Sequence, residues 1–195
     1  MNYITGNGDT KSEHREVNFF DRLDVSGNFN VDIVNAEKIK IDIEAEENLL
    51  KHIQTRVRDK TLYISSRRNL RPTEEMSIIV QVPMIKMISC SGLNNITAYD
   101  LNNDELTINL SGASNIKVSG ITKYFDLDVS GAADIDAKEL IAEYVRIDVS
   151  GASNAEIFAT KSAVVDVSGT GNVTLYGSAN DVKMDVSGAG SFRRK

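Results

Sequence analysis

The sequence has little of what crosslinks or interrupts a folded chain. Its 195 residues include two prolines, Pro72 and Pro83, one cysteine, Cys90, no tryptophan, and only 6% aromatic residues. So little proline, with no glycine or serine tract, excludes a collagen-like or disordered chain, and a single cysteine excludes an internal disulfide. Because 41% of the residues are hydrophobic, the chain can still bury a core, and we expect it to be folded throughout.

Long hydrophobic runs and a surplus of positive charge are also missing. The longest apolar stretches, such as residues 78–80, are far shorter than the roughly 20 residues of a membrane-spanning helix, so we expect no transmembrane segment. The 22 Lys and Arg residues against 28 Asp and Glu give a net charge of −6, which argues against nucleic acid or anionic lipid as a partner. The first nine residues are polar, unlike a signal peptide, so the protein is either intracellular or a processed form whose export signal has been removed.

The pair Ser-Gly is present in excess, since eight of the 13 glycines follow a serine. Six of these pairs recur at steps of 18 to 20 residues: Ser91-Gly92, Ser111-Gly112, Ser130-Gly131, Ser150-Gly151, Ser168-Gly169 and Ser187-Gly188. Apolar residues alternate with polar ones before each pair, as at Ile147 and Val149, and again after it, as at Ala155 and Ile157. A period of two indicates half-buried strands rather than a helix.

Each Ser-Gly pair is predicted to form a corner between two strands, because glycine tolerates positive φ and Asn or Asp can hydrogen-bond the backbone of a turn. The predicted corner residues are Ser111, Gly112, Asn115, Ser130, Gly131, Asp134, Ser150, Gly151, Asn154, Ser168, Gly169 and Asn172. A unit of about 19 residues is too short for a crossover helix or a propeller blade but fits one coil of a parallel β-solenoid. We therefore predict an all-β, single-stranded right-handed parallel β-helix, right-handed because parallel crossovers generally are; an antiparallel sandwich is the structural alternative.

The pattern is looser before residue 90. Leu49, Leu50, Ile53 and Val57 fall at helical spacing and predict a short N-terminal helix that caps the first coil. No linker divides the chain. We expect residues 1–16 to be an N-terminal extension and residues 17–195 to be one β-solenoid domain, with irregular first coils and the cap over 17–90 and regular Ser-Gly repeats over 91–191.

The order of these features also points to a family. A Gly-Asn-Gly opening is followed by Phe20 and Leu23-Asp24-Val25-Ser26-Gly27, then by Asn48-Leu49-Leu50, Leu62-Tyr63-Ile64 and serial corners such as Ser111-Gly112-Ala113-Ser114-Asn115-Ile116. Over nearly the whole chain this order resembles the bacterial family called "putative auto-transporter adhesin, head GIN domain". The resemblance implies an exported β-helical adhesin, often an anchored lipoprotein, in the periplasm, the outer membrane or at the cell surface. It supplies no catalytic residues.

Four aspartates, Asp128, Asp148, Asp166 and Asp185, occupy the same place in successive predicted coils. Carboxylates about 5 Å apart repel each other by about 0.8 kcal/mol per pair in water, so cations must offset this row. Arg146 and Lys183 lie two positions before Asp148 and Asp185, on the same predicted face. Ca²⁺, which takes oxygen ligands, is the metal candidate for the row, and a solvated strand face is the alternative. We expect no other cofactor.

The remaining candidates are hydroxyl, thiol and aromatic side chains. The serines do not predict a nucleophile, because His14 and His52 are remote in sequence from every corner, and Cys90 falls at an inward apolar position. Tyr124, Tyr144 and Tyr176 fall in the third stretch of successive coils. They predict an aromatic stripe suited to stacking on sugar rings, with core or rim packing as the alternative.

These features favour a noncatalytic cell-envelope protein, an adhesin whose ligand is a glycan or a protein. The first alternative is a carbohydrate-active β-helix enzyme, a polysaccharide lyase or hydrolase, which would normally carry a long loop that no coil after residue 90 contains. The second is an envelope scaffold that assembles as a homo-oligomer through its open C-terminal coil.

Overall fold

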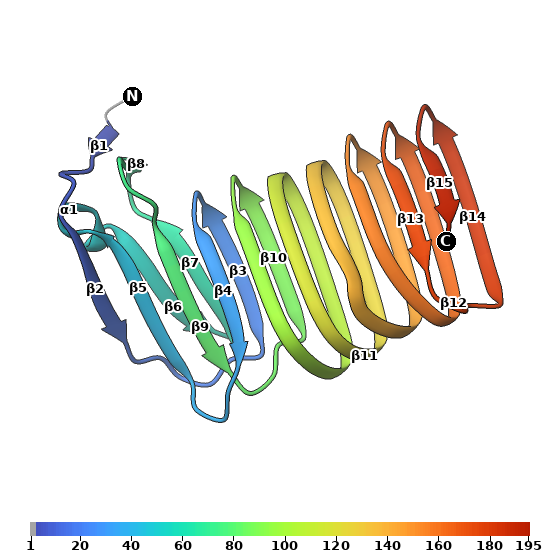
Figure 1. The fold of residues 1–195 in the computed structure, drawn as a ribbon. Helices are drawn as coiled ribbons and strands as arrows, with labels where there is room; N and C mark the ends of the chain where they lie inside the picture. The colour runs from blue at the N-terminus through green and yellow to red at the C-terminus, as the bar shows by residue number, and fades with distance from the viewer. Residues whose placement is uncertain (1–2) are drawn as a thin grey trace.

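A computed structural model of the chain describes residues 3–195 as strands connected by turns, with one helical turn (Figure 1). The N-terminal elements are β1 (Tyr3–Thr5), β2 (Thr10–Arg15), β3 (Arg22–Gly27), β4 (Asn30–Asn35), β5 (Lys40–Glu46), α1 (Glu47–Leu50), β6 (Ile53–Arg58), β7 (Thr61–Ser66) and β8 (Asn69–Arg71). They are followed by β9 (Ser77–Val82), β10 (Met87–Gly92), β11 (Asn95–Gly151), β12 (Asn154–Gly169), β13 (Asn172–Tyr176), β14 (Asp181–Gly188) and β15 (Ser191–Arg194). The long strand β11 bends round the molecule several times.

Strands form where apolar and polar residues alternate, because successive side chains of a strand point to opposite faces of the sheet. The inward positions make one continuous core. One column of that core consists of Ile88, Ile108, Leu127, Ile147 and Val165, each at most 1% exposed. Burial of each such side chain stabilises the fold by about 1.5–3 kcal/mol before entropy is considered, so the core to which this column belongs is the main source of stability.

The Ser-Gly segments lie side by side, parallel and in register. Ser91 of β10 pairs with Ser26 of β3 on one side and with Ser111 of β11 on the other. Further along, Ser150 pairs with Ser168, and Ser168 with Ser187. The predicted parallel pairing of equivalent positions is therefore confirmed for these segments.

The predicted fold class is nevertheless wrong, although the chain is all-β as expected. Three pairings are antiparallel, β2 with β5, β5 with β9, and β6 with β7. Thirteen strands join into one mixed, nearly closed, barrel-like sheet wrapped round the core, so the protein is not a single-stranded right-handed parallel β-helix. Asp59 and Lys60, between β6 and β7, both have positive φ, 49° and 59°. Two such residues make a tight hairpin turn, which reverses the chain where a parallel coil would need a crossover.

The predicted capping helix is also shorter than expected. It consists of the single turn α1, while Ile53 and Val57 lie on β6. Residues four apart lie on the same face of a strand as well as of a helix, so the spacing could not distinguish the two.

The first 16 residues, predicted as an extension, contain β1 and β2. β1 pairs with β8 in a small two-stranded sheet that projects from the end of the molecule (Figure 1), whereas β2 pairs with β5 inside the main sheet. Within residues 3–195, the one helical turn is too short and too polar to cross a membrane.

Glu46, at the junction of β5 and α1, links the segments around Gly8 and Thr73 through its side chain. Its side chain is fully buried and accepts hydrogen bonds from the Gly8 amide (2.7 Å), the Thr73 hydroxyl (2.7 Å) and the Thr73 amide (3.0 Å), with the Glu74 amide at 3.5 Å. Burial alone would raise the pKa of this carboxyl, but the bonds from Thr73, Gly8 and Glu74 outweigh it, and the pKa of Glu46 lies below its ordinary value. Gly6 passes so close that a Cβ at this position would overlap the Glu46 carboxylate.

Candidate functional site

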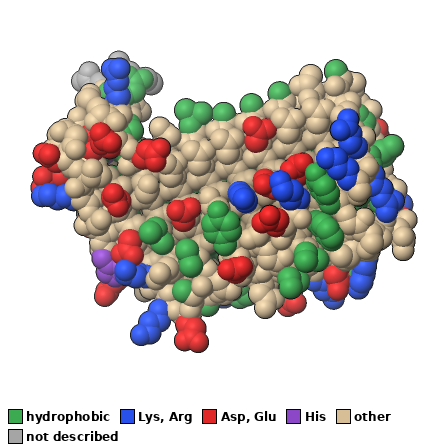
Figure 2. Space-filling model, viewed as in Figure 1, with side chains coloured by type: hydrophobic (Ala, Val, Ile, Leu, Met, Phe, Trp, Pro, Cys, Tyr) green, Lys and Arg blue, Asp and Glu red, His purple; other side chains and the backbone are tan. Residues whose placement is uncertain are grey.

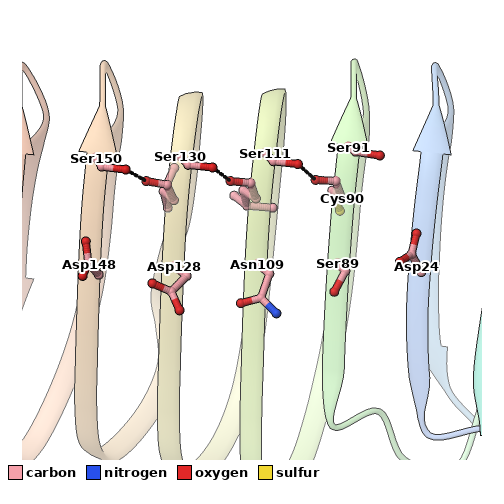
Figure 3. A pocket seen from close by; sticks show the side chains of 12 residues that line it. Asp24, Ser89, Cys90, Ser91, Asn109, Ser111, Asp128, Ser130, Asp148 and Ser150 are labelled. Carbon is pink, nitrogen blue, oxygen red and sulfur yellow. Dashed lines mark hydrogen bonds between the residues drawn. The ribbon is translucent and has the colours of Figure 1, made fainter.

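The strands that lead into the Ser-Gly pairs present two parallel rows of polar side chains to solvent. The polar row consists of Asp24, Ser89, Asn109, Asp128, Asp148, Asp166 and Asp185, two positions before each serine. The serine row consists of Ser26, Ser91, Ser111, Ser130, Ser150, Ser168 and Ser187. Figure 3 shows the first five members of the polar row side by side, with Ser91, Ser111, Ser130 and Ser150 above the last four of them.

A groove of about 310 Å³ runs across β3, β10 and β11 between these rows. Its walls are the side chains from Asp24 to Asp148 in the polar row and from Ser91 to Ser150 in the serine row, and Cys90, Leu110 and Val129 complete its lining. The groove therefore offers carboxylate, amide and hydroxyl groups at the regular spacing of adjacent strands, about 4.8 Å.

The serine hydroxyls of this groove bond to backbone rather than to a base. Ser111 donates to the Cys90 carbonyl (3.4 Å), Ser130 to that of Leu110 (3.5 Å) and Ser150 to that of Val129 (3.3 Å) (Figure 3). Of the two histidines, His14 contacts Asp42 at 3.1 Å, and His52 follows α1. Neither lines the groove, so no imidazole is placed to activate a serine.

Cys90 lies at the base of the groove, 3% exposed, as a free thiol. Burial, with a smaller effect from the nearby Asp24 carboxylate, raises the pKa of this thiol to about 12. A thiol held in its neutral form is a poor nucleophile, and Cys90 acts as the core residue that its inward position predicts.

Two carboxylates of this face have raised pKa values. Burial raises the pKa of Asp24, and burial together with the charge of Asp128 raises the pKa of Asp126, which Arg146 partly offsets. Asp148, Asp166 and Asp185 pair directly with one another across β11, β12 and β14. Within residues 3–195, however, no three His, Cys, Asp or Glu side chains converge to hold a metal ion.

The predicted aromatic stripe has two neighbouring members and one that lies elsewhere. Tyr124 and Tyr144 stack with ring centroids 5.2 Å apart and planes at 19°. Tyr144 pairs with Ser162, whereas Tyr176 pairs with Phe158 and donates its hydroxyl to Glu156 (2.9 Å).

Lysines also cover this tyrosine pair. The Lys123 ammonium lies 5.3 Å from the Tyr124 ring centre and that of Lys161 lies 5.4 Å from the Tyr144 ring centre, both in cation–π contact. The rings contact each other and the lysines through their faces, which leaves mainly ring edges and hydroxyls to a ligand.

The predicted corner residues lie side by side on neighbouring strands, as where Gly151 pairs with Gly169 and Asn154 with Asn172. Gly112, Gly131, Gly151 and Gly169 all have φ between 129° and 159°. The amides that follow them form hydrogen-bonded steps between strands, Asn115 to Asn95 (3.0 Å), Asn154 to Asp134 (2.9 Å) and Asn172 to Asn154 (3.0 Å).

Four of the five charged members of the polar row were predicted as site residues, whereas the fifth, Asp24, and the neutral members were not. Asp24, Ser89 and Asn109 line the groove but were not among the predicted site residues. Their signal was present, because each stands two residues before a Ser-Gly pair.

Comparison with known proteins gives a family and several related folds. Residues 19–179 match the family described as "Putative auto-transporter adhesin, head GIN domain". No curated protein sequence matches the chain. The fold is similar to the crystal structure of a "putative adhesin" from Bacteroides fragilis, with a TM-score of 0.79 and 21% identity over 98% of this chain and 100% of the other.

Two structures from Parabacteroides are also similar over the full length of both chains. One is a "putative adhesin" from Parabacteroides merdae, with a TM-score of 0.61 and 19% identity. The other is a "putative lipid binding protein" from Parabacteroides distasonis, with a TM-score of 0.59 and 18% identity. At these identities the likeness establishes the fold alone.

Proposed function

Because the chain belongs to the family described as "Putative auto-transporter adhesin, head GIN domain", we propose that it is a noncatalytic adhesin of the cell envelope that binds a glycan in the groove between the polar and serine rows. The observation that carries the proposal is the regular succession of carboxylate, amide and hydroxyl groups across β3, β10 and β11. Sugar hydroxyls both donate and accept hydrogen bonds, so they can pair with all three kinds of group. A chain of sugars would meet similar partners at each strand.

The chemistry of the groove favours binding over catalysis. Its serines donate to backbone carbonyls and have no histidine partner, and Cys90 is buried with a raised pKa. Tyr124 and Tyr144 do not line the groove, and they would offer a ligand mainly hydroxyls and ring edges, a contact that is weaker than stacking on a free ring face.

Glycan binding is tested with a double variant of the polar row, Asp128→Asn with Asp148→Asn. We expect it to weaken binding to the best glycan on an array by about tenfold or more, because two charge-assisted hydrogen bonds become neutral ones. Asp32→Asn is the matched control, since Asp32 lies exposed on β4, away from the groove, and its loss should leave binding unchanged. Equal binding by all three proteins would reject this groove as the site, and binding to protein ligands but to no glycan would reject the ligand class.

Calcium is proposed as a counter-ion of the same row and is tested with the same proteins. Ca²⁺ should raise the melting temperature of the wild type more than NaCl of equal ionic strength does, and the double variant should lose that difference. An identical response to the two salts would mean that the aspartates are merely screened.

Self-assembly through the C-terminal strands is a further proposal. Met184 on β14 is 62% exposed, whereas its partner Val165 on β12 is fully buried, so apolar surface is less covered at this end. A second copy that covers β14 and β15 would bury this apolar surface.

Light scattering at rising protein concentration should then show dimers, and Met184→Lys should abolish them. Lys183→Ala is the control, because Lys183 is the outward neighbour of Met184. A strictly monomeric wild type would overturn the proposal.

A further inference from the structure

Positive charge is concentrated in one segment of this acidic protein. Residues 51–71 hold seven of the 22 Lys and Arg residues but only one of the 28 Asp and Glu residues, Asp59. This segment contains β6, at the edge of the main sheet, and β7 beside it. The net charge of the whole chain therefore hides a strongly basic segment.

Part of the surface of this basic segment is concave. A groove of about 420 Å³ is lined by Arg15, Glu16, Lys51, Ile53, Gln54, Thr55, Arg56 and Arg67. The N–H groups of Arg15 are used within the protein, since its guanidinium donates to the Leu50 and Ile53 carbonyls and to Glu13. Lys51, Arg56 and Arg67 are exposed and remain for a ligand.

The two arginines are held close together by a neutral group. With the Gln54 amide oxygen facing them, Oε1 accepts from Arg67 Nε (2.8 Å) and Nη2 (3.2 Å) and from Arg56 Nη2 (3.2 Å). In the described part of the chain, no carboxylate lies within 4.0 Å of the charged nitrogens of Lys51, Arg56 or Arg67. Glu16 is the one acidic residue that lines the groove.

A nearby histidine, His52, has a lowered pKa to which this positive charge contributes. His52 stands between Lys51 and Ile53, and its backbone carbonyl accepts from the Arg67 amide (2.9 Å). Burial, then the charges of Lys51, Arg68 and Arg67, lower its pKa. The positive charges that contribute to this shift would also attract an anion, whereas the larger effect of burial would not.

We propose that this groove binds a phosphate or sulfate group through Arg56 and Arg67, with Lys51 as a third cation. Guanidinium groups present paired N–H donors that match two oxygens of such a group. The Gln54 amide oxygen holds the guanidinium groups of Arg56 and Arg67 in place before the ligand arrives. The group could be part of a lipid headgroup or of a phosphorylated or sulfated saccharide. The site is separate from the groove between the polar and serine rows and does not depend on it.

The test titrates the full chain with sodium sulfate and sodium phosphate by calorimetry and thermal melting, against NaCl of equal ionic strength. The test variant is Arg56→Gln with Arg67→Gln. The matched control is Arg58→Gln, because Arg58 lies on the same strand but outside the groove, 3.5 Å from Asp59. We expect the double variant to weaken anion binding by about tenfold or more and the control to change it by about twofold or less.

A vesicle arm separates the two sources of the anion. Sedimentation with vesicles of phosphatidylcholine alone is compared with vesicles that also contain phosphatidylglycerol. If the protein binds the anionic vesicles, sulfate competes with this binding and the double variant loses it, the site is assigned to a lipid headgroup. If the protein binds inorganic anions but not the vesicles, the site is assigned to a soluble phosphorylated or sulfated ligand. No stabilisation beyond that of chloride, or equal losses in Arg58→Gln and the double variant, would overturn the proposal.

Discussion

Replacing Gly112 by alanine is expected to lower the free energy of unfolding by about 4 kcal/mol, measured by urea denaturation. Gly112 has φ of 129°, a conformation that side chains rarely adopt. A Cβ there would lie 2.6 Å from the carbonyl oxygen and 2.8 Å from the amide nitrogen of Gly92 on the adjacent strand. Both obstacles are backbone atoms inside the sheet, so relief requires the strands to separate locally.

Gly8→Ala is the control that separates backbone strain from collision. Gly8 also has positive φ, 79°, but a Cβ there would meet no atom within 4 Å. We expect a loss of about 1 kcal/mol, from strain alone. Equal losses of unfolding free energy in Gly8→Ala and Gly112→Ala would show that the close approach of neighbouring strands does not explain why glycine stands at position 112.

The second large effect is expected at Glu46, where Glu46→Gln should lower the free energy of unfolding by about 3 kcal/mol at pH 7. The carboxylate receives four hydrogen-bond donors, two at each oxygen. Glutamine keeps one acceptor oxygen and places an NH₂ group against the other two donors. Glu47→Gln is the neighbouring control, because Glu47 is exposed and forms a surface ion pair with Lys11 (2.6 Å), worth about 0.5 kcal/mol.

The effect at Glu46 should also depend on pH in a definite direction. Its pKa is lowered in the folded protein, so its contribution is complete above the pKa of an unfolded glutamate, about 4.3, and is lost as the pH falls through the lower folded value. The difference in stability between wild type and Glu46→Gln should therefore shrink in acid. A difference that stays constant from neutral pH to strong acid would contradict the role assigned to the hydrogen-bonded carboxylate.

The inward and outward positions of the strands could be predicted because they follow from side-chain alternation alone. Ile147 and Val149 are buried, Ser150 is exposed, and Ser150 meets Ser168 as its position requires. Strand direction could not be predicted this way, since the alternation of Lys40–Glu46 is the same for a parallel and an antiparallel partner. The hairpin turn at Asp59 and Lys60 is the local feature that makes β6 and β7 antiparallel. It could not be recognised in the sequence, because neither residue is the glycine or asparagine that usually marks such a turn.

The candidate sites were predictable only where position in a strand determined them. The register brought Asp148 and Asp166 together, but Tyr176, which follows a corner by a different number of residues from Tyr144, lies in another row. Glu46 gave no signal, because its parity in the strand is that of Asp42 and Glu44, which are not fully buried. The basic groove was hidden because net charge averages over the whole chain, in which the basic residues 51–71 are outweighed by acidic residues elsewhere. The face of the molecule in Figure 2 mixes acidic, basic and apolar side chains.

The arrangement of strands also determines how the molecule bears mechanical load. Among the described strands, β15 pairs only with β13, and β14 only with β12. A force that pulls on the C-terminal strands thus breaks the hydrogen bonds of one strand pair at a time, as a zipper opens, and each rupture is local. The groove between the polar and serine rows lies on β3, β10 and β11, which have partners on both sides. The groove can therefore keep its shape while the outermost strands separate under the load.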